Sequence, residues 1–132
     1  MIQKMKSLQY RKVIRPLFYR CLAILLLAAQ ISFAANELEG LNAKAAAGDA
    51  NAQFELGKIY EIGQKTERNV EEAFKWYLKA AQQGHAESQF KVGKCFFHGY
   101  GTDLDQNVGV QWFQVAAEKD HSQAIFQLAR CY

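Results

Sequence analysis

Ser88 and Lys91 form an S-x-x-K motif, the spacing of the serine nucleophile in penicillin-binding enzymes. The S-D-N and K-T-G motifs that complete such an active site do not follow in the chain. Ser88 also stands 36 positions after Ala52 and 36 before Ala124, two small residues at the same place in a repeated pattern. We therefore predict that Ser88 packs in a helix, and we expect no catalytic residue.

His85 and His121 are also 36 positions apart, and Asp49 holds the matching place one repeat earlier. Equivalent points on packed helices lie about 8 to 10 Å apart, whereas two imidazoles that bind one zinc ion each place a nitrogen about 2.1 Å from it. No third ligand recurs with them. We predict that both histidines lie where a helix begins, and we expect no metal and no cofactor. His98 lies among aromatic residues and is interpreted as a loop residue.

Cys95 and Cys131 are the two cysteines outside the N-terminal segment, and both match the apolar residue Ile59. A bridge between them would have to span about 8 to 10 Å between neighbouring helices, but a disulfide needs Cα atoms within about 7 Å. Two free thiols are predicted, which would be unusual in an oxidising compartment.

These residues belong to a 36-residue repeat that organises the chain. The segment 48–63 returns as 84–99, the segment 73–84 returns as 109–120, and a third copy begins at Asp120. A fixed period of this length is typical of a solenoid, in which each unit buries its apolar face against its neighbours. The recurring structural positions are Phe54, Gly57, Tyr60, Trp76, Ala80, Phe90, Gly93, Phe96, Trp112, Ala116 and Phe126.

The apolar spacing within each unit predicts two helices, so the fold class is all-α. Asp49 and Asn69 are favourable N-caps for the first and second helix, and Gly63 is expected to end the first. The glycines at 57 and 93 should let neighbouring backbones approach. We predict a signal peptide at 1–34, an N-terminal half-repeat or capping helix at 35–47, repeats at 48–83 and 84–119, and a partial third repeat at 120–132 that holds its first helix only.

The partial third repeat lacks the helix that would cover Phe126 and Leu128. Two interpretations stay open. Either the chain is a truncated repeat array without independent function, or its open end associates with a second copy.

The N-terminal segment has the pattern of an export signal. Six of the 16 basic residues precede the apolar run that begins at Cys21, no acidic residue occurs before Glu37, and 32–34 read Ser-Phe-Ala, a small-residue cleavage pattern. Without 1–34, ten bases face 13 acids, so the net charge changes from +3 to about −3. The basic character therefore belongs to the signal, and nucleic acid is not expected as a partner.

A retained inner-membrane anchor is the alternative, since basic residues hold such an anchor on the cytoplasmic side. The uninterrupted run from Cys21 to Ala29 is shorter than the roughly 20 residues of a spanning helix. Export to the periplasm or beyond is preferred, with membrane contact only through an uncleaved leader.

The recurring residues resemble the Sel1-like repeats, helix-pair solenoids related to tetratricopeptide repeats. The motifs that match are L-G-x-x-Y (Leu56, Gly57, Tyr60), G-x-G (Gly99, Gly101) and A-x-x-W-Y-x-x-A-A (Ala73, Trp76, Tyr77, Ala80, Ala81). The loop between the helices is longer than in a tetratricopeptide unit, which favours the Sel1 type. Lys65 in place of a turn glycine and Gly109 in place of an alanine depart from the pattern.

This resemblance implies a right-handed superhelix whose concave face, lined mainly by the first helix of each pair, binds a protein or peptide. It also implies a non-catalytic adaptor in bacterial envelope assembly, signalling or host interaction. A β-lactam-binding or hydrolysing enzyme is the alternative, because cysteine-rich Sel1-like proteins have been linked to that activity. Candidate contact residues on this face are Gln53, Glu55, Lys58, Glu61, Gln89, Lys91, Lys94, Gln127 and Arg130.

Overall fold

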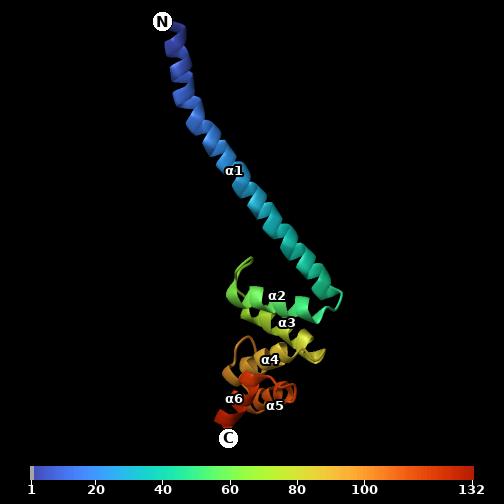
Figure 1. Cartoon of the computed structure of the whole chain (residues 1–132). Helices are drawn as coiled ribbons and strands as arrows, with labels where there is room; N and C mark the ends of the chain where they lie inside the picture. The colour runs from blue at the N-terminus through green and yellow to red at the C-terminus, as the bar shows by residue number, and fades with distance from the viewer. Residues whose placement is uncertain (1) are drawn as a thin grey trace. The chain divides into compact units, whose positions relative to one another are not determined.

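The computed structural model describes residues 2–132, with side chains described from Ile14 onward (Figure 1). This part of the chain is built from helices and their connecting turns. The six helices are α1 (Ile2–Ala46), α2 (Ala50–Ile62), α3 (Val70–Gln82), α4 (Ala86–His98), α5 (Gln106–Ala117) and α6 (Ser122–Cys131). Two compact units are present, one over residues 1–37 and one over residues 38–132.

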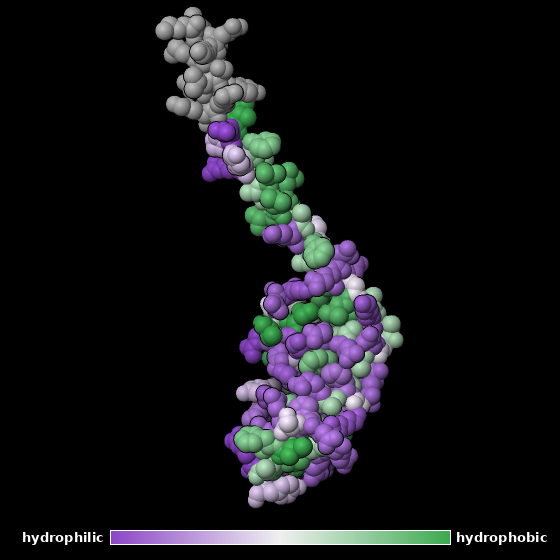
Figure 2. All heavy atoms as spheres, viewed as in Figure 1, coloured by the Kyte–Doolittle hydropathy of each residue, from purple (hydrophilic) through white to green (hydrophobic). Residues whose placement is uncertain are grey.

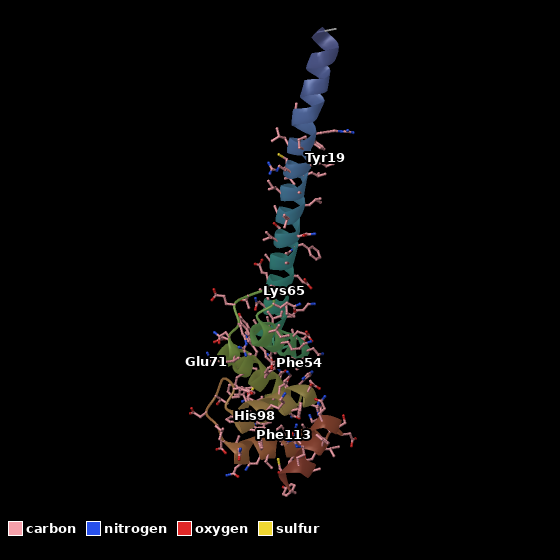
Figure 3. All side chains as sticks on the ribbon, turned by 90° about the vertical axis from the view of Figure 1, so that its left-hand side faces the viewer. Tyr19, Phe54, Lys65, Glu71, His98 and Phe113 are labelled. Carbon is pink, nitrogen blue, oxygen red and sulfur yellow. The ribbon has the colours of Figure 1, made fainter. Side chains whose placement is uncertain are left out.

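The N-terminal unit consists of the larger part of α1. Its helix from Ile14 is apolar and long enough to cross a membrane, with a mean hydropathy of 1.8 in an 18-residue window of which none is buried. A signal sequence has the same properties. Hydrophobic residues gather along this helix (Figure 2), and Tyr19 projects from it with 63% of its surface exposed (Figure 3). Met1 and the side chains of the leader bases Lys4, Lys6, Arg11 and Lys12 lie outside the described part of the structure.

We call the C-terminal unit, residues 38–132, the repeat unit. In it, polar side chains at the helix starts and glycines at the helix ends fix the helix boundaries. The Asp49 carboxylate accepts a hydrogen bond from the Ala52 N–H, and the Asn69 side chain accepts one from the Glu72 N–H, both at 3.0 Å. Gly63 closes α2 in the left-handed conformation, with φ of 75°. These contacts satisfy amide groups that have no partner inside the helix, and they confirm the predicted caps.

The core of the repeat unit consists of three clusters that follow one another along the chain. In the first, Leu38, Leu41 and Ala45 of α1 pack with Ala52 and Leu56 of α2. The second surrounds the buried Tyr77 of α3, Val92 of α4 and their neighbours. The third joins α4, α5 and α6 around Phe90, Phe113 and Ala124. Each unit thus buries its apolar face against the next, as a solenoid requires.

Close helix approach depends on glycine at matching places. A Cβ atom on Gly57 would overlap the Tyr77 ring, and one on Gly93 would lie 2.6 Å from the Phe113 ring. The predicted role of these glycines is confirmed. Glycine is required at position 109 for the same reason, since a Cβ there would lie 2.9 Å from both the Gly93 carbonyl oxygen and the Phe97 amide nitrogen.

Helix α6 presents part of its apolar side to solvent. Phe126 is 62% exposed, whereas Phe90 at the matching position of α4 is 5% exposed. The difference arises because α3 and α5 cover α2 and α4, while α6 contacts α5. The prediction that Phe126 lacks cover within this chain is confirmed.

Candidate functional site

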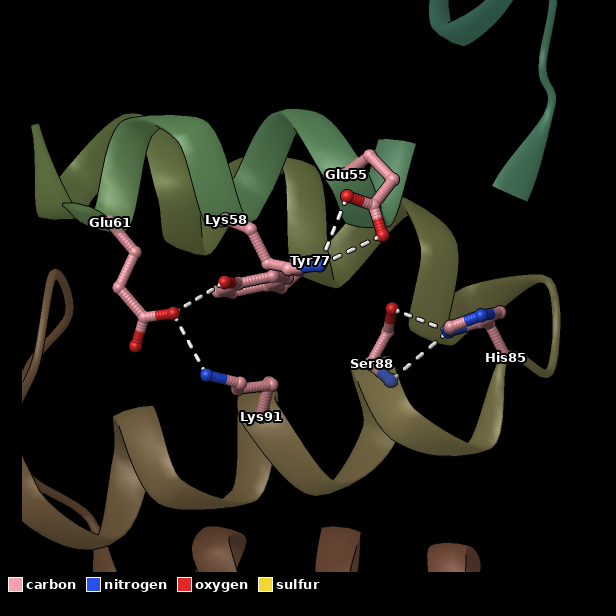
Figure 4. A network of polar contacts seen from close by, with 7 residues as sticks. All are labelled: Glu55, Lys58, Glu61, Tyr77, His85, Ser88 and Lys91. Atoms are coloured by element: carbon pink, nitrogen blue, oxygen red, sulfur yellow. Dashed lines mark hydrogen bonds and ion pairs between the residues drawn. The ribbon is translucent and has the colours of Figure 1, made fainter. Parts of the chain in front are cut away.

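A three-residue polar network joins the first repeat to the second. The Tyr77 hydroxyl of α3 donates a 2.6 Å hydrogen bond to Glu61 Oε2 of α2, and Lys91 Nζ of α4 lies 2.8 Å from the same oxygen (Figure 4). The network ties three helices together at one carboxylate. It forms because Glu61 lies at the C-terminal end of α2, beside the middle of α4.

The electrostatics of the network favour an ionised carboxylate. Partial burial alone would raise the pKa of Glu61, but the hydrogen bonds from Lys91 and Tyr77 and the charges of Lys91 and Lys94 outweigh it. The pKa of Glu61 therefore lies below its ordinary value. Burial and the neighbouring Glu61 carboxylate raise the pKa of Tyr77, so its hydroxyl remains a donor.

The network has no copy in the second repeat. Phe97 stands where Glu61 would recur, and Phe113 stands where Tyr77 would recur. Their rings pack with centroids 5.9 Å apart. The polar link is thus a feature of one repeat interface rather than a requirement of the fold.

A pocket with a cavity volume of about 310 Å³ opens beside the network. Side chains of α2, α3, α4 and the two inter-helix loops line it. They are Glu61, Arg68, Val70, Ala73, Lys91, Lys94, Cys95 and Tyr100. A mainly apolar floor with polar groups at the rim is the usual build of a binding pocket.

Basic side chains dominate the charge of the pocket. Arg68 donates through Nε to the Glu61 backbone oxygen at 3.1 Å, and the Lys94 ammonium lies 5.9 Å from the centroid of the Phe90 ring. Among the described residues, neither side chain forms an ion pair. With Lys91 paired to Glu61, Arg68 and Lys94 are the two positive charges left without a carboxylate partner there.

Cys95 forms part of the pocket wall as a free thiol. It is 9% exposed, and burial raises the pKa of this thiol to about 11. The group is therefore a neutral thiol near neutral pH and a poor nucleophile. Cys131 is a free thiol too, and it is exposed. Both cysteines are unbridged, as predicted.

The S-x-x-K motif does not form a nucleophile with its lysine. Ser88 has no exposed surface, and its Oγ lies 2.8 Å from His85 Nδ1. Lys91 points instead to Glu61 (Figure 4). A serine with a histidine partner can serve as a nucleophile, but no substrate atom can reach this buried hydroxyl. The packing role predicted for Ser88 is confirmed.

The two repeated histidines act at helix starts. His85 Nδ1 accepts from the Ser88 N–H, and His121 Nδ1 accepts from the Ala124 N–H, each at 3.2 Å. Nδ1 is thus the acceptor in each ring. His121 also links repeats, because its Nε2 lies 2.7 Å from Glu87 Oε2 of α4. Desolvation lowers the pKa of His85, despite the opposing charges of Glu87 and Glu55.

The prediction that Gln53 and Gln89 lie on the contact surface was wrong. Gln53 and Gln89 are 5% and 4% exposed, so neither can contact a partner. Gln53 Nε2 donates to the Ala45 carbonyl at 3.0 Å, and Gln89 Nε2 donates to the Ala81 carbonyl at 3.2 Å. Each glutamine satisfies the end of the preceding helix, which explains why a polar side chain is buried there.

The other candidate contact residues keep some exposed surface. Glu55 and Lys58 pair on α2 at 3.0 Å, and Glu61, Lys91 and Lys94 surround the pocket. Gln127 and Arg130 lie on α6. The structure therefore gathers three of the nine predicted residues at one place.

Arg68 and Tyr100 also line the pocket, and the sequence reasoning missed them. Both lie in inter-helix loops, where the apolar helix period gives no signal. Tyr100 stands between the turn glycines Gly99 and Gly101, and Arg68 lies five positions after Gly63 in the first loop. Their place in these loops was the available hint, since functional residues are often carried by loops.

Two copies of the Sel1 repeat model match the chain, over residues 50–85 and 86–121. Among solved structures, the Sel1 repeat protein from Oxalobacter formigenes is 29% identical with a TM-score of 0.68 and covers 70% of this chain and 27% of its own. The uropathogenic Escherichia coli protein c5321, described as a protective antigen with an SLR fold, is 36% identical with a TM-score of 0.67, covering 69% of this chain and 20% of its own. Helicobacter pylori cysteine rich protein B is 21% identical with a TM-score of 0.66 over 69% of this chain and 68% of its own, and shares the fold.

Curated relatives match shorter stretches. The chitin synthase regulator SKT5 of Saccharomyces cerevisiae is 46% identical over 59 residues, and the putative sel1-like repeat-containing protein L18 of Acanthamoeba polyphaga mimivirus is 40% identical over 45 residues. The matches cover 42% and 34% of this chain and 8% of each relative.

The family model, the solved structures and the helix pairs agree on one architecture. The fold is the all-α helical repeat solenoid that the sequence predicted. Sel1 repeat proteins generally act as scaffolds that bind other proteins. Because the two repeat matches cover more than half of its residues, the chain belongs to the Sel1 repeat family.

Proposed function

We propose that this chain is an exported, non-catalytic protein-interaction module whose binding surface is the helix-A face. This name denotes the surface formed by the exposed side chains of α2 and α4, together with the pocket beside Glu61. One observation carries the proposal, namely that α2 and α4 bring a charged network and a partly open pocket together on one surface.

The chemistry of this surface suits recognition rather than catalysis. Its partners lower the pKa of Glu61, and Lys91 Nζ lies 2.8 Å from the Glu61 carboxylate. General acid or base work calls for a group whose pKa lies near the working pH. The pocket instead presents an ion pair and two further basic side chains, and charged groups of this kind orient and select a partner.

The alternative of a β-lactam enzyme depends on Ser88. Its hydroxyl is fully buried against His85, so acylation would need part of α4 to open. We expect no nitrocefin turnover by the purified chain beyond that of a Ser88→Ala variant. Turnover that Ser88→Ala abolishes would restore the enzymatic alternative.

Export is proposed from residues 1–34, in which a basic segment precedes an apolar one. We propose a bacterial source, cleavage after Ala34 and release into the periplasm or beyond. N-terminal sequencing of the product from a bacterial host tests this. A Leu25→Arg variant, which places a charge in the apolar segment, should abolish cleavage, whereas Leu104→Arg in a loop should not. An uncleaved product in the membrane would favour the anchor instead.

A second candidate function is self-association through α6, favoured by the 62% exposure of Phe126 beside the half-exposed Ile125. Light scattering on the full chain in mild detergent tests it with Phe126→Ser as the variant. A dimer of the wild-type chain that Phe126→Ser converts to a monomer supports the proposal. A monomer with both sequences removes it.

Site-specific photocrosslinking tests the helix-A face directly. A photoreactive amino acid at Glu55 samples α2, and the same group at the exposed Gln111 samples α5 as a matched control. In the bacterial host, we expect a discrete protein adduct from position 55 and none from position 111. An adduct from position 111 alone, or from neither position, would contradict the proposal.

A further inference from the structure

The pocket beside Glu61 carries an excess of positive charge. Its lining includes three basic side chains, Arg68, Lys91 and Lys94, and one carboxylate, Glu61. The carboxylate is already occupied by Lys91 and the Tyr77 hydroxyl. A net charge of about +2 therefore remains, and it belongs to Arg68 and Lys94.

The floor of the pocket is apolar. Its apolar lining residues are the less exposed ones, since Ala73 and the neutral thiol of Cys95 are buried and Val70 is partly buried, whereas Tyr100 has 58% of its surface exposed. A side chain with one or two methylene groups and a negatively charged end matches this combination of an apolar floor and basic side chains. The methylenes would contact the floor, and the charged end would meet the cations.

We propose that this pocket receives an aspartate or glutamate side chain of a protein partner, with Lys94 and Arg68 as the groups that bind its carboxylate. The inference rests on the proposed function, because it names the chemistry that the helix-A face recognises. Arg68 is suited to this role, since its Nε is fixed on the Glu61 carbonyl and the rest of the guanidinium fork remains to donate.

A protein partner fits this charge pattern better than a nucleic acid does. Nucleic-acid binding draws on many phosphate contacts along an extended basic track. Here the basic cluster is local, and Glu71 and Asp103 line the neighbouring pocket between the start of α3 and the loop after α4. Acidic groups so close by would repel a second phosphate, but they leave a single carboxylate room to bind.

Glu61 gives the proposal an unusual test, because it competes with the ligand for Lys91. Replacing Glu61 with Gln keeps a hydrogen-bond acceptor for Tyr77 but removes the charge that neutralises Lys91. The pocket should then bind a carboxylate more tightly. Simple loss of local structure would weaken binding, so the direction of change separates the two explanations.

The experiment uses the full chain in a mild nonionic detergent and two immobilised peptide libraries with random flanks. One library has a fixed central glutamate and the other a fixed central glutamine. We expect selective retention on the glutamate library, with retention that falls as salt rises. Selected peptides should bind Lys94→Gln and Arg68→Gln roughly three- to tenfold more weakly, bind Glu61→Gln more tightly, and bind the control Lys44→Gln unchanged.

The outcomes separate the inference from the function on which it depends. Equal retention on both libraries, or glutamate selection that Lys94→Gln and Arg68→Gln leave unaltered, would overturn the pocket assignment and keep the binding module. A third library has a fixed central phosphoserine. If its peptides compete with the glutamate peptides for the pocket and bind more tightly, the ligand is a phosphate and the assignment of a carboxylate is overturned. Retention on none of the libraries would count against both proposals.

Discussion

Lys91 and Glu61 are 30 positions apart in the chain, yet they form a 2.8 Å ion pair that joins α2 of the first repeat to α4 of the second. The same Glu61 oxygen accepts the Tyr77 hydroxyl at 2.6 Å. One carboxylate thus links α2, α3 and α4 at the edge of the proposed binding pocket. In the next repeat the matching positions are filled by Phe97 and Phe113.

Because an aromatic pair replaces this polar network in the second repeat, each of the two matching sites should prefer its own residue. Tyr77→Phe should lower the free energy of unfolding by about 1 kcal/mol, because it removes one hydrogen bond and keeps the ring. Phe113→Tyr should cost about 1 to 3 kcal/mol, because its hydroxyl would be buried beside Phe97 without an acceptor. Urea unfolding of both variants measures this. A Phe113→Tyr variant as stable as the wild type would show that the second interface is not the apolar environment described.

The His85 cap predicts a loss of stability on acidification. Desolvation holds the folded-state pKa of His85 below its ordinary value of 6.5, so the unfolded chain takes up the proton first. The stabilising contribution is complete above about pH 6.5 and is lost as the pH falls through the lower folded value. Protonation of Nδ1 removes the acceptor of the Ser88 N–H.

His85→Asn supplies the comparison, because asparagine is a good N-cap that does not titrate. We expect the free energy of unfolding to fall less between about pH 8 and about pH 5 in the variant than in the wild type. The groups whose charges act on His85 are Glu87, Glu55 and Lys119, and all three are retained. Equal pH dependence in both proteins would contradict this account of the cap.

Two thiols in matching positions should differ in reactivity. Burial raises the pKa of Cys95 to about 11 from 9.0, so its thiolate fraction near neutral pH is about a hundredfold lower than that of an unperturbed thiol. Cys131 is exposed. Cys21 is also free and exposed, so both variants carry Cys21→Ser as well. Reaction with an aromatic disulfide reagent should then label Cys131 quickly in the Cys95→Ser variant, and label Cys95 slowly in the Cys131→Ser variant until the chain unfolds. Similar rates would mean that the pocket opens far more often than its packing indicates.

A buried amide oxygen predicts a stabilising substitution. Gln53 Oε1 accepts from Gln83 Nε2 at 2.7 Å, but the matching oxygen of Gln89 has no hydrogen-bond partner among the described residues. Lys119, in the place of Gln83, donates to the Gly84 carbonyl instead. Lys119→Gln should raise the free energy of unfolding by up to about 1 kcal/mol. Gln83→Ala in the first repeat should lower it by a similar amount. A decrease for Lys119→Gln would show that the contact with Gly84 matters more.

The caps and close approaches of the fold could be predicted because they depend on local chemistry. Asp49 and Asn69 cap helices by accepting from amides three positions later. Glycine is required where an aromatic ring packs against the helix, as Tyr77 does at Gly57 and Phe113 does at Gly93. Such features repeat with the chain, so two copies in the sequence made them visible. Handedness and the course of the binding face depend on how repeats stack, which no local pattern encodes.

The burial of Gln53 and Gln89 was not predicted, because polarity alone suggested the surface. The signal was present in their recurrence, since the same residue type stands at the same register in both full repeats. The polar network around Glu61 could not be found in this way. It occurs in one repeat only, and its partners meet through tertiary packing.

Hydrogen exchange on the full chain, with and without its crosslinked or peptide partner, tests the central claim most directly. Binding at the helix-A face should slow exchange in α2, in α4 and in the loops that carry Arg68 and Tyr100, and leave α3 and α5 unchanged apart from the start of α3 at the pocket floor. Protection confined to the remainder of α3 and to α5, or to α1, would place the partner elsewhere and contradict the account.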